Sequence, residues 1–251
     1  MARFPIFHHA SFDDKRSLSD AKTFFNKQSR IVVKSFAKEL TALKVEEIFF
    51  RDMYRQICLL TKFPLVKEER WRGVFDLTDE KLDGLLTYAY IDAEAGFTFE
   101  TLAGAQVANG RLKTFPANYK KYVKLKRSEV DAAELKILTA EYSLAFRDRI
   151  KIIDDRISDE VKEPTRFIKN LDAFRHPYYP DDVVVYFFST EHKPELLWVR
   201  CESVDENILT GELLNEPTKN FGCHAGDKIK FGVAQMGEQN ILIYLPTKGS
   251  E

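Results

Sequence analysis

The sequence is poor in the residues that build cross-linked or loop-rich folds. Its 251 residues include only three cysteines, Cys58, Cys201 and Cys223, and no Cys-x-x-Cys pair. An odd number of widely spaced cysteines argues against a disulfide framework and a cysteine-built zinc site, and favours a reducing compartment. Glycine (11) and proline (9) are also scarce, which argues against a loop-rich scaffold.

Long apolar runs and nucleotide-binding motifs are lacking as well. No stretch approaches the roughly 18 apolar residues of a membrane helix, and the N-terminus lacks the apolar core of a signal peptide. The chain contains no G-x-x-x-x-G-K-[ST], G-x-G-x-x-G or G-x-S-x-G motif. Most large nucleotide-using and hydrolase classes therefore lose support. We expect a cytoplasmic protein with no cofactor and no membrane partner.

The chain does have enough apolar side chains for a sizeable core, with 44% hydrophobic residues, 20 Phe and 10 Tyr. Its formal net charge of −1 is unevenly spread. Residues 1–180 hold 32 Lys+Arg and 27 Asp+Glu, a balance of +5, whereas residues 181–251 hold 6 and 12, a balance of −6. This asymmetry can help two parts of the chain dock, or it can present different surfaces to partners.

Periodicity predicts an α+β protein in which residues 1–175 form a mainly helical domain. Apolar residues recur at helical spacing in residues 20–43, 45–60 and 128–157, and acids open a further predicted helix at 78–93. The EIFF piece of the second segment can instead be read as a strand. Alternation around Asn109-Gly110 predicts a β-hairpin near residues 97–115. After the junction AFRHPYYPDD, five short runs predict a small antiparallel β domain at 181–247, a barrel or a sandwich.

Three motifs stand in order within this predicted β domain: Trp198-Val199, GELLNEP from Gly211, and GDKIKF from Gly226. In order and spacing, about residues 182–235 resemble the YegJ-like bacterial domain of unknown function. The acid and tryptophan that commonly close such domains are replaced here by GVAQMGEQNILIYLP. The resemblance implies a bacterial protein and brings no established activity. It implies structural roles for Trp198, Gly211, Asn215, Glu216, Pro217, Gly226 and Asp227.

The clearest functional pattern is a basic segment in which no acid occurs between Glu100 and Glu129. Cations pair with phosphates and aromatic rings stack on unpaired bases, and an acidic protein surface would suit the same segment. A solvated surface, or one docked on the chain's own acidic C-terminal part, is the plain alternative. The candidate binding residues are Arg111, Lys113, Tyr119, Lys120, Lys121, Tyr122, Lys124, Lys126 and Arg127.

Groups that carry catalysis or bind metals are sparse. Adjacent side chains diverge, so Cys223-His224 does not supply a nucleophile together with its base. His8-His9 lacks the spacing of zinc ligands, and we expect no metal. Adjacent carboxylates are frequent in a chain that is 31% charged, and they are typical of a solvated surface. We therefore assign no catalytic residue.

The leading hypothesis is a non-enzymatic protein-interaction or regulatory module, of which an immunity-type protein is one form, with a protein partner. The first alternative is an enzyme whose site lies between the two domains and uses Glu216, Asp227, His176 or His224. The second is weak nucleic-acid binding through residues 111–127. An exposed apolar patch would favour the interaction module, whereas a cleft of converging acids and histidines would favour the enzyme.

Overall fold

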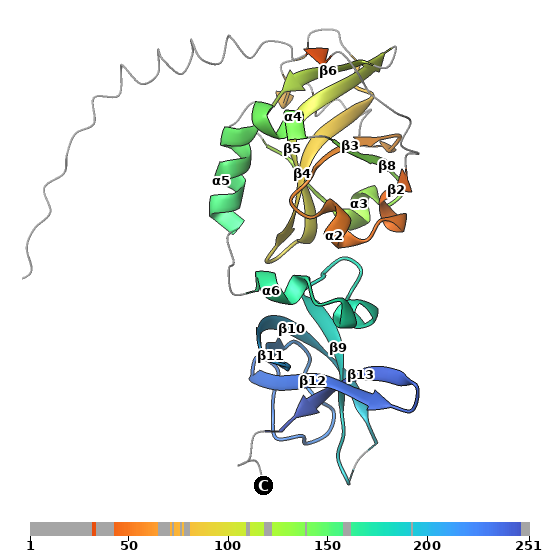
Figure 1. Cartoon of the computed structure of the whole chain (residues 1–251), viewed down its shortest axis with the longest axis vertical. Helices are drawn as coiled ribbons and strands as arrows, with labels where there is room; N and C mark the ends of the chain where they lie inside the picture. The colour runs from red at the N-terminus through yellow and green to blue at the C-terminus, as the bar shows by residue number, and fades with distance from the viewer. Residues whose placement is uncertain are drawn as a thin grey trace, which may run out of the picture.

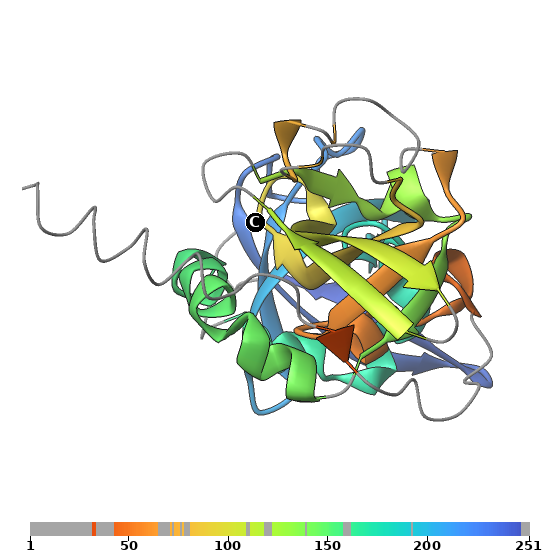
Figure 2. The same ribbon diagram turned by 90° about the horizontal axis from the view of Figure 1, so that it is seen from above.

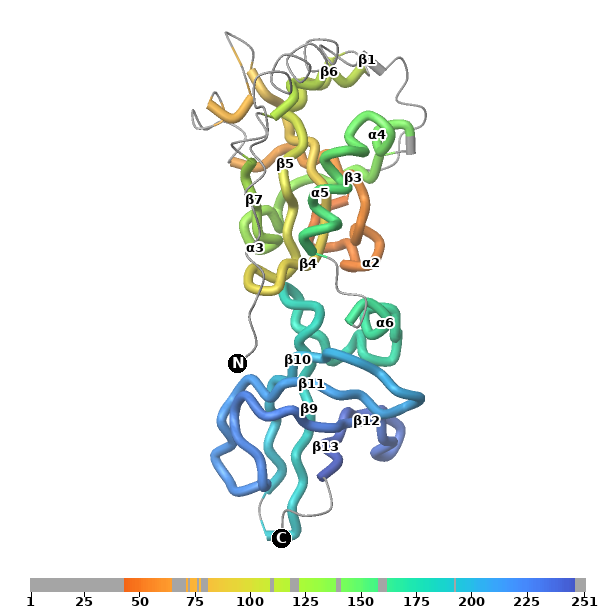
Figure 3. Tube along the Cα trace, turned by 90° about the vertical axis from the view of Figure 1, so that its left-hand side faces the viewer, coloured from red at the N-terminus to blue at the C-terminus, as the bar shows by residue number. Residues whose placement is uncertain are grey.

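The computed structural model describes residues 32–33, 43–64, 71, 73–75, 77, 81–108, 111–117, 122–138, 140–157, 162–191 and 193–246. The chain forms two β-rich parts stacked along the longest axis of the molecule (Figure 1). We call residues 43–157 together with β1 the sheet part, and residues 182–245 the barrel part. Short helical segments lie between them, and a quarter turn of the view shows α6 in the same place (Figure 3).

The sheet part is one antiparallel sheet with the strand order β1-β6-β5-β4-β3-β8-β2, in which β7 pairs with β5. Its strands are β1 (Val32–Val33), β2 (Leu43–Lys44), β3 (Ile57–Thr61), β4 (Gly84–Asp92), β5 (Gly96–Ala108), β6 (Arg111–Pro116), β7 (Lys124–Lys126) and β8 (Glu134–Ile137). Strands β4 and β5 form a long hairpin, and its tip at residues 93–95 points toward the barrel part (Figure 1).

Short helices cover both faces of this sheet. They are η1 (Val45–Glu47), α2 (Phe50–Met53), α3 (Arg127–Val130), α4 (Ala140–Ala145) and α5 (Arg147–Ile157). Tyr142, Phe146 and Ile153 of the α4–α5 segment pack on one face of the strands. Phe50 and Met53 belong to the core on the other face. Seen from above, the green helices α4 and α5 lie together on one side of the sheet (Figure 2).

The prediction of an α+β protein with a mainly helical N-terminal domain is wrong. Residues 84–92, within a predicted helix, form β4, and residues 134–137, within the longest predicted helix, form β8. The segment 45–60 contains only η1 and α2 before it enters β3. Most of the predicted helix at 20–43 lies outside the described residues. Nearly every residue of β4 and β5 is buried, because both faces of the sheet are covered. Such a strand reads as a continuous apolar run, which periodicity cannot distinguish from a buried helix.

The barrel part is a closed barrel with the strand order β10-β11-β12-β13-β9. Its strands are β9 (Asp182–Phe187), β10 (Glu195–Asp205), β11 (Ile208–Leu213), β12 (Lys228–Met236) and β13 (Gln239–Leu245). Sequential strands are antiparallel, and an odd number of strands closes only through one parallel pair. That pair is β13 with β9, at Ile243 and Tyr186. Alternate residues such as Val183, Val185 and Phe187 fill the interior.

Polar contacts join the two parts. The segments α6 (Glu163–Arg166) and η4 (Lys169–Phe174) precede the barrel. The Arg166 side chain is buried, donates from Nη1 to Tyr54 Oη at 2.8 Å, and forms two hydrogen bonds with Asp181, at 2.9 and 2.7 Å. One side chain therefore ties the sheet part, α6 and the start of the barrel together.

A close backbone approach adds a second connection between the parts. The Phe97 amide donates to the Tyr178 carbonyl at 2.8 Å, and the Tyr178 hydroxyl donates to Asp131 Oδ2 at 2.6 Å. Gly96 has φ +73°, and a Cβ there would lie 2.3 Å from the Tyr178 carbonyl oxygen. Only glycine is compatible with both the backbone angle and the contact.

Candidate interaction surface and cleft

The structure divides the predicted basic segment between two strands. Arg111 and Lys113 lie on β6, whereas Lys124 and Lys126 lie on β7. The two strands pair with opposite ends of β5, β6 with residues 103–108 and β7 with residues 98–100. These cations therefore do not form one continuous stripe. Lys120, Lys121 and Tyr119 lie outside the described residues.

Two of the predicted binding residues make internal contacts. Arg127 is buried and donates to the carbonyl oxygens of Val45 and Ile48 at 3.1 and 2.9 Å. Lys124 Nζ lies 2.7 Å from Asp92 Oδ2. Because these groups already serve the fold, they contribute less to a surface for nucleic acid than the sequence pattern indicates.

The loop between β11 and β12 holds the Cys223-His224 pair. His224 Nδ1 and Glu216 Oε1 are 2.7 Å apart, and Glu216 Oε2 accepts the Ala225 amide at 2.9 Å. The His224 amide donates to Asp227 Oδ2 at 2.7 Å. The hydrogen bond between the two side chains raises the pKa of His224 and lowers the pKa of Glu216. Cys223 is buried, which raises the pKa of its thiol. This arrangement closes a loop and provides no activated nucleophile.

Three residues of the motif that resembles the YegJ-like domain make contacts between strands of the barrel. The Trp198 amide donates to Asn215 Oδ1 at 2.9 Å, which ties the end of β11 to β10. A Cβ at Gly211 would lie 2.4 Å from the Arg200 carbonyl oxygen, where β10 and β11 shift register. His176 packs edge-on against Trp198, with ring centroids 5.3 Å apart.

The outside of the barrel carries an apolar face across β9, β10 and β13. Tyr186 lies opposite Leu196, and Val184 lies opposite Trp198. The Tyr186 and Phe188 rings stack with centroids 5.8 Å apart. Phe188 is 47% exposed and Leu196 is 52% exposed. We define the apolar barrel face as Val184, Tyr186, Phe188, Leu196, Trp198 and Ile243.

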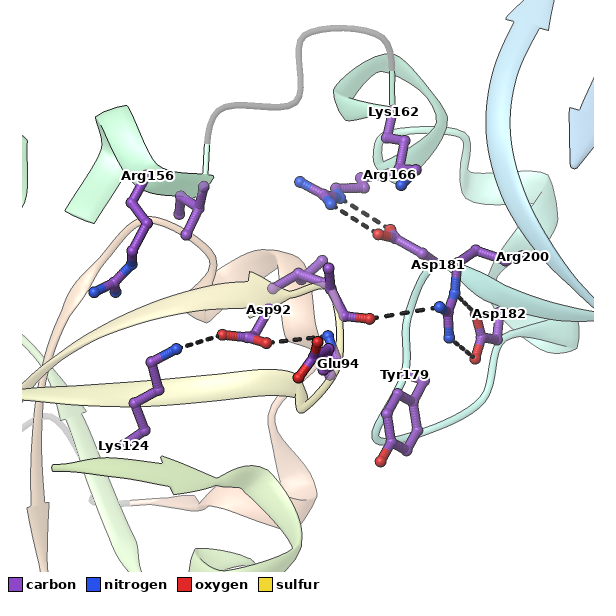
Figure 4. Close-up of a pocket in the computed structure, with 14 residues that line it drawn as sticks. Asp92, Glu94, Lys124, Arg156, Lys162, Arg166, Tyr179, Asp181, Asp182 and Arg200 are labelled. Carbon is purple, nitrogen blue, oxygen red and sulfur yellow. Dashed lines mark hydrogen bonds and ion pairs between the residues drawn. The ribbon is translucent and has the colours of Figure 1, made fainter. Parts of the chain in front are cut away.

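A cleft of about 400 Å³ lies between the two parts. The tip of the β4–β5 hairpin, the C-terminal end of α5, α6, and strands β9 and β10 surround it (Figure 4). Its charged lining consists of the cations Lys124, Arg156, Lys162, Arg166 and Arg200 and the carboxylates Asp92, Glu94, Asp181 and Asp182. Charged side chains from both parts of the chain therefore converge on one space.

Ion pairs fix much of this lining. Arg200 makes two hydrogen bonds to Asp182, at 2.8 and 3.2 Å, and Arg166 makes two to Asp181. Partial burial raises the pKa of Asp92, but hydrogen bonds from Lys124 and two backbone amides outweigh it, so its pKa is lowered. Burial lowers the pKa of Arg166, but the bond to Asp181 outweighs it and raises the pKa.

One further charged group lies behind the wall of the cleft. Glu100 is completely buried on β5, and both Arg149 and Arg156 form ion pairs with it. Tyr90 donates its hydroxyl to the same carboxylate at 3.0 Å. Both guanidinium groups also lie over the ring of Tyr122, 4.8 and 5.4 Å from its centroid. One negative charge is thus shared by two arginines.

The enzyme alternative named four residues, and none of those four described residues lines the cleft. Glu216, Asp227 and His224 meet in the surface loop, and His176 lies beside Trp198. Within the described part of the chain, no group of three His, Cys, Asp or Glu side chains could hold a metal ion. Sequence reasoning missed the charged lining of the cleft; the junction AFRHPYYPDD, which was interpreted only as a domain boundary, contains Asp181 and Asp182 of that lining.

Comparison with known proteins does not extend this description. No family model, curated protein or solved structure matches this chain. No helix among the residues that the structure describes has both the length and the apolar character needed to cross a membrane.

Proposed function

We propose that this protein is a non-enzymatic protein-interaction module whose contact surface is the apolar barrel face. The observation that carries the proposal is the row of apolar side chains on the outside of β9 and β10. An antiparallel strand with one buried face ordinarily places polar residues on the other. Contiguous exposed apolar surface often marks a protein–protein contact. Tyrosine and tryptophan are also among the side chains that contribute most at such contacts.

The charge of the barrel part defines the chemistry of the partner. Residues 181–251 contain 6 Lys+Arg and 12 Asp+Glu. The exposed Glu191 lies in the loop that joins β9 and β10, at one end of the apolar barrel face. An acidic surface attracts a basic one and accelerates its association. The partner is therefore a protein surface with an apolar centre and a basic rim.

Leu196→Asp tests this proposal, with Leu144→Asp as the matched control. Leu196 is 52% exposed on the apolar barrel face, and Leu144 is 75% exposed on α4. Tagged wild type and both variants are incubated with a nuclease-treated native lysate, and retained proteins are quantified by mass spectrometry. We expect one protein to be retained by wild type and Leu144→Asp and lost from Leu196→Asp. With that protein purified, the Leu196→Asp Kd should rise at least about tenfold.

Two results would contradict the proposal. Equal retention of that protein by all three chains would place the contact elsewhere on the molecule. Retention that disappears only with nuclease would favour nucleic-acid binding instead. Sedimentation velocity of the wild type and Leu196→Asp adds a further check. Self-association that is lost in Leu196→Asp would identify a second copy of the chain as the partner.

A further inference from the structure

The apolar barrel face runs across three neighbouring strands in register. Leu196 on β10 lies opposite Tyr186 on β9, and Tyr186 lies opposite Ile243 on β13. The barrel is closed, so each of these strands already pairs on both sides. Whatever covers the face therefore contacts it through side chains that pack on the outside of the strands.

The chain itself offers a candidate to cover this face, the segment of residues 1–31. These residues precede β1 and lie outside the described structure. Residues 247–251, TKGSE, follow the barrel and contain no large apolar side chain. The longer undescribed stretches within the chain, such as 34–42, are joined at both ends to elements of the sheet part. Residues 1–31 are therefore the stretch to consider as an occupant.

Residues 1–31 have the composition that this face requires of a partner. The stretch MARFPIFHHASF includes Phe4 and Ile6 and no acid. Residues 1–31 hold 6 Lys+Arg and 3 Asp+Glu, a balance of +3, whereas residues 181–251 have a balance of −6. Residues 32–180 hold 26 and 24, a balance of +2. Electrostatic attraction therefore favours the barrel part over the sheet part as the docking place of this segment.

Pro5 favours the backbone geometry that such packing needs. A residue before proline is biased toward an extended conformation, so we expect Phe4 to be extended. In an extended segment, residues two positions apart point to the same side, about 7 Å from each other. Tyr186 and Phe188 are also two positions apart, and their ring centroids are separated by 5.8 Å. Phe4 and Ile6 therefore have a spacing similar to that of the side chains on the face.

The segment is also long enough to reach the barrel part. Val32 pairs with β6, which lies at the end of the molecule away from the barrel (Figure 1), and β6 pairs with β5. A path along β5 to Gly96, across to Tyr178 and on to Tyr186 measures at most roughly 75 Å, at about 3.3 Å per residue. The stretch from Ile6 to Val32 spans up to roughly 85 Å when it is extended. Ile6 can therefore reach the face without any change in the sheet.

We propose that the segment around Phe4 and Ile6 occupies the apolar barrel face in the free protein and competes with the partner for it. This inference rests on the proposed function, because it describes how the same face is regulated. Phe4 and Ile6 pack against Tyr186 and Leu196. The partner binds only chains in which the face is open, so its apparent affinity falls with the fraction of such chains.

Disulfide trapping in the full chain tests where the segment lies. The pair Ile6→Cys with Leu196→Cys probes the face, and Ile6→Cys with Leu144→Cys is the matched control, because Leu144 is 75% exposed on α4. The three native cysteines are buried, so they compete little for oxidation. Dilute protein is mildly oxidised, and non-reducing gels with peptide mass spectrometry measure the cross-links. We expect a cross-link within one chain that forms at least about fivefold faster in the Leu196→Cys pair, because docking raises the effective concentration of the thiol.

Binding of Nile red, a neutral apolar dye, tests whether the segment covers the face. Phe4→Asp with Ile6→Asp should uncover the face and raise the dye fluorescence above that of wild type. Adding Leu196→Asp to this variant should abolish the increase. The control is Leu18→Asp with Phe24→Asp, which changes the charge of the segment equally and should leave the dye fluorescence at the wild-type level.

Three outcomes overturn the proposal. Equal cross-linking in the two cysteine pairs would show that the segment does not select the face. Cross-links between chains, instead of within one chain, would identify a second copy as the occupant. Equal dye fluorescence in both double-aspartate variants would mean that the face is open in the free protein. These outcomes leave the proposed function intact, because retention of a partner by the wild type and its loss in Leu196→Asp are measured separately.

Discussion

The two parts of this chain place their polar residues in opposite ways. In the sheet part, Glu100 and Arg149 are buried between the strands and α5. In the described barrel part, the interior is apolar, and the only charged side chain among its buried residues is Asp182, at the first position of β9. The outside of the barrel instead carries exposed apolar side chains such as Phe188 and Leu196.

This difference follows from how each part covers its strands. The sheet is covered on both faces, so a charged residue on β5 has no route to solvent and must find partners inside. A barrel has only one buried face, so alternate residues reach solvent and charges stay outside. Burial in the barrel core does not account for apolar residues on that outer face, such as Phe188 and Leu196, and this is the ground on which we propose a partner for the apolar barrel face.

Glu100→Gln is expected to have the largest effect on stability. It leaves Arg149 and Arg156 without their carboxylate, and breaking a buried ion pair typically costs about 3–5 kcal/mol. Trp71 lies in the sheet part and Trp198 in the barrel part, so single-tryptophan variants report on each part separately during urea unfolding. The unfolding midpoint that Trp71 fluorescence reports should shift to a lower urea concentration.

The exposed Glu94 provides the control for this experiment. Glu94→Gln should leave the free energy of unfolding within about 0.5 kcal/mol of wild type, as is usual for surface substitutions. A Glu100→Gln variant that behaves like Glu94→Gln would show that the buried charge is dispensable. Replacing Glu100, Arg149 and Arg156 together by apolar residues of similar size should recover much of the loss.

The stability of the barrel part should depend on close packing between its strands more than on buried charge. Gly211→Ala places a Cβ 2.4 Å from the Arg200 carbonyl oxygen, whereas a Cβ at Gly232 meets its nearest atoms at 3.6 Å. We expect Gly211→Ala to lower the free energy of unfolding by about 1–3 kcal/mol, because β10 and β11 must move apart. Urea unfolding followed by Trp198 fluorescence measures this loss of stability.

Gly232→Ala is the matched control in the same barrel. It should leave stability unchanged or slightly higher, since alanine reduces the entropy of the unfolded chain. Equal destabilisation by both substitutions would show that the close approach of β10 and β11 is not the cause.

The same difference explains which elements could be predicted from the sequence. The five alternating runs after residue 181 coincide with β9 to β13, because one buried face produces a period of two. In β4 the run GLLTYAYI is almost wholly buried, so no period remains to identify a strand. Glu100 illustrates the same problem for function, because the sequence shows an ordinary acid and not one buried between two arginines.

The cleft was even less visible in the sequence, because its charged lining comes from segments that are distant along the chain. Lys124 pairs with Asp92 across 32 positions, and Arg166 with Tyr54 across 112. A sequence motif covers neighbouring residues, so it cannot reveal pairs that are this far apart in the chain. The basic segment was misleading for the converse reason, since neighbours in sequence, such as Lys126 and Arg127, differ in exposure once folded.

Tyr54→Phe tests whether the two parts unfold together. It removes the hydroxyl that accepts from Arg166, and a hydrogen bond to a charged group is typically worth about 1.5–3 kcal/mol. Because this bond joins the sheet part to α6, we expect the Trp71 and Trp198 transitions to separate along the urea axis. Tyr88→Phe is the control, since Tyr88 donates to Asp154 within the sheet part at 2.9 Å. It should shift the Trp71 transition and leave the Trp198 transition in place.

The smallest effect is expected at the surface of the barrel, where His224 and Glu216 pair in full solvent. The bond to Glu216 raises the pKa of His224 above its ordinary value of 6.5, so this contribution is complete below that pH and is lost as pH rises through the raised pKa. The pKa of Glu216 is lowered, so its contribution is present above 4.5 and is lost as pH falls through the lowered pKa. An NMR titration of the His224 ring measures this directly. Glu216→Gln should return the His224 pKa toward its ordinary value, and Glu238→Gln, at the far end of β12, should not. An identical titration in both variants would mean that the loop is closed by its backbone contacts alone.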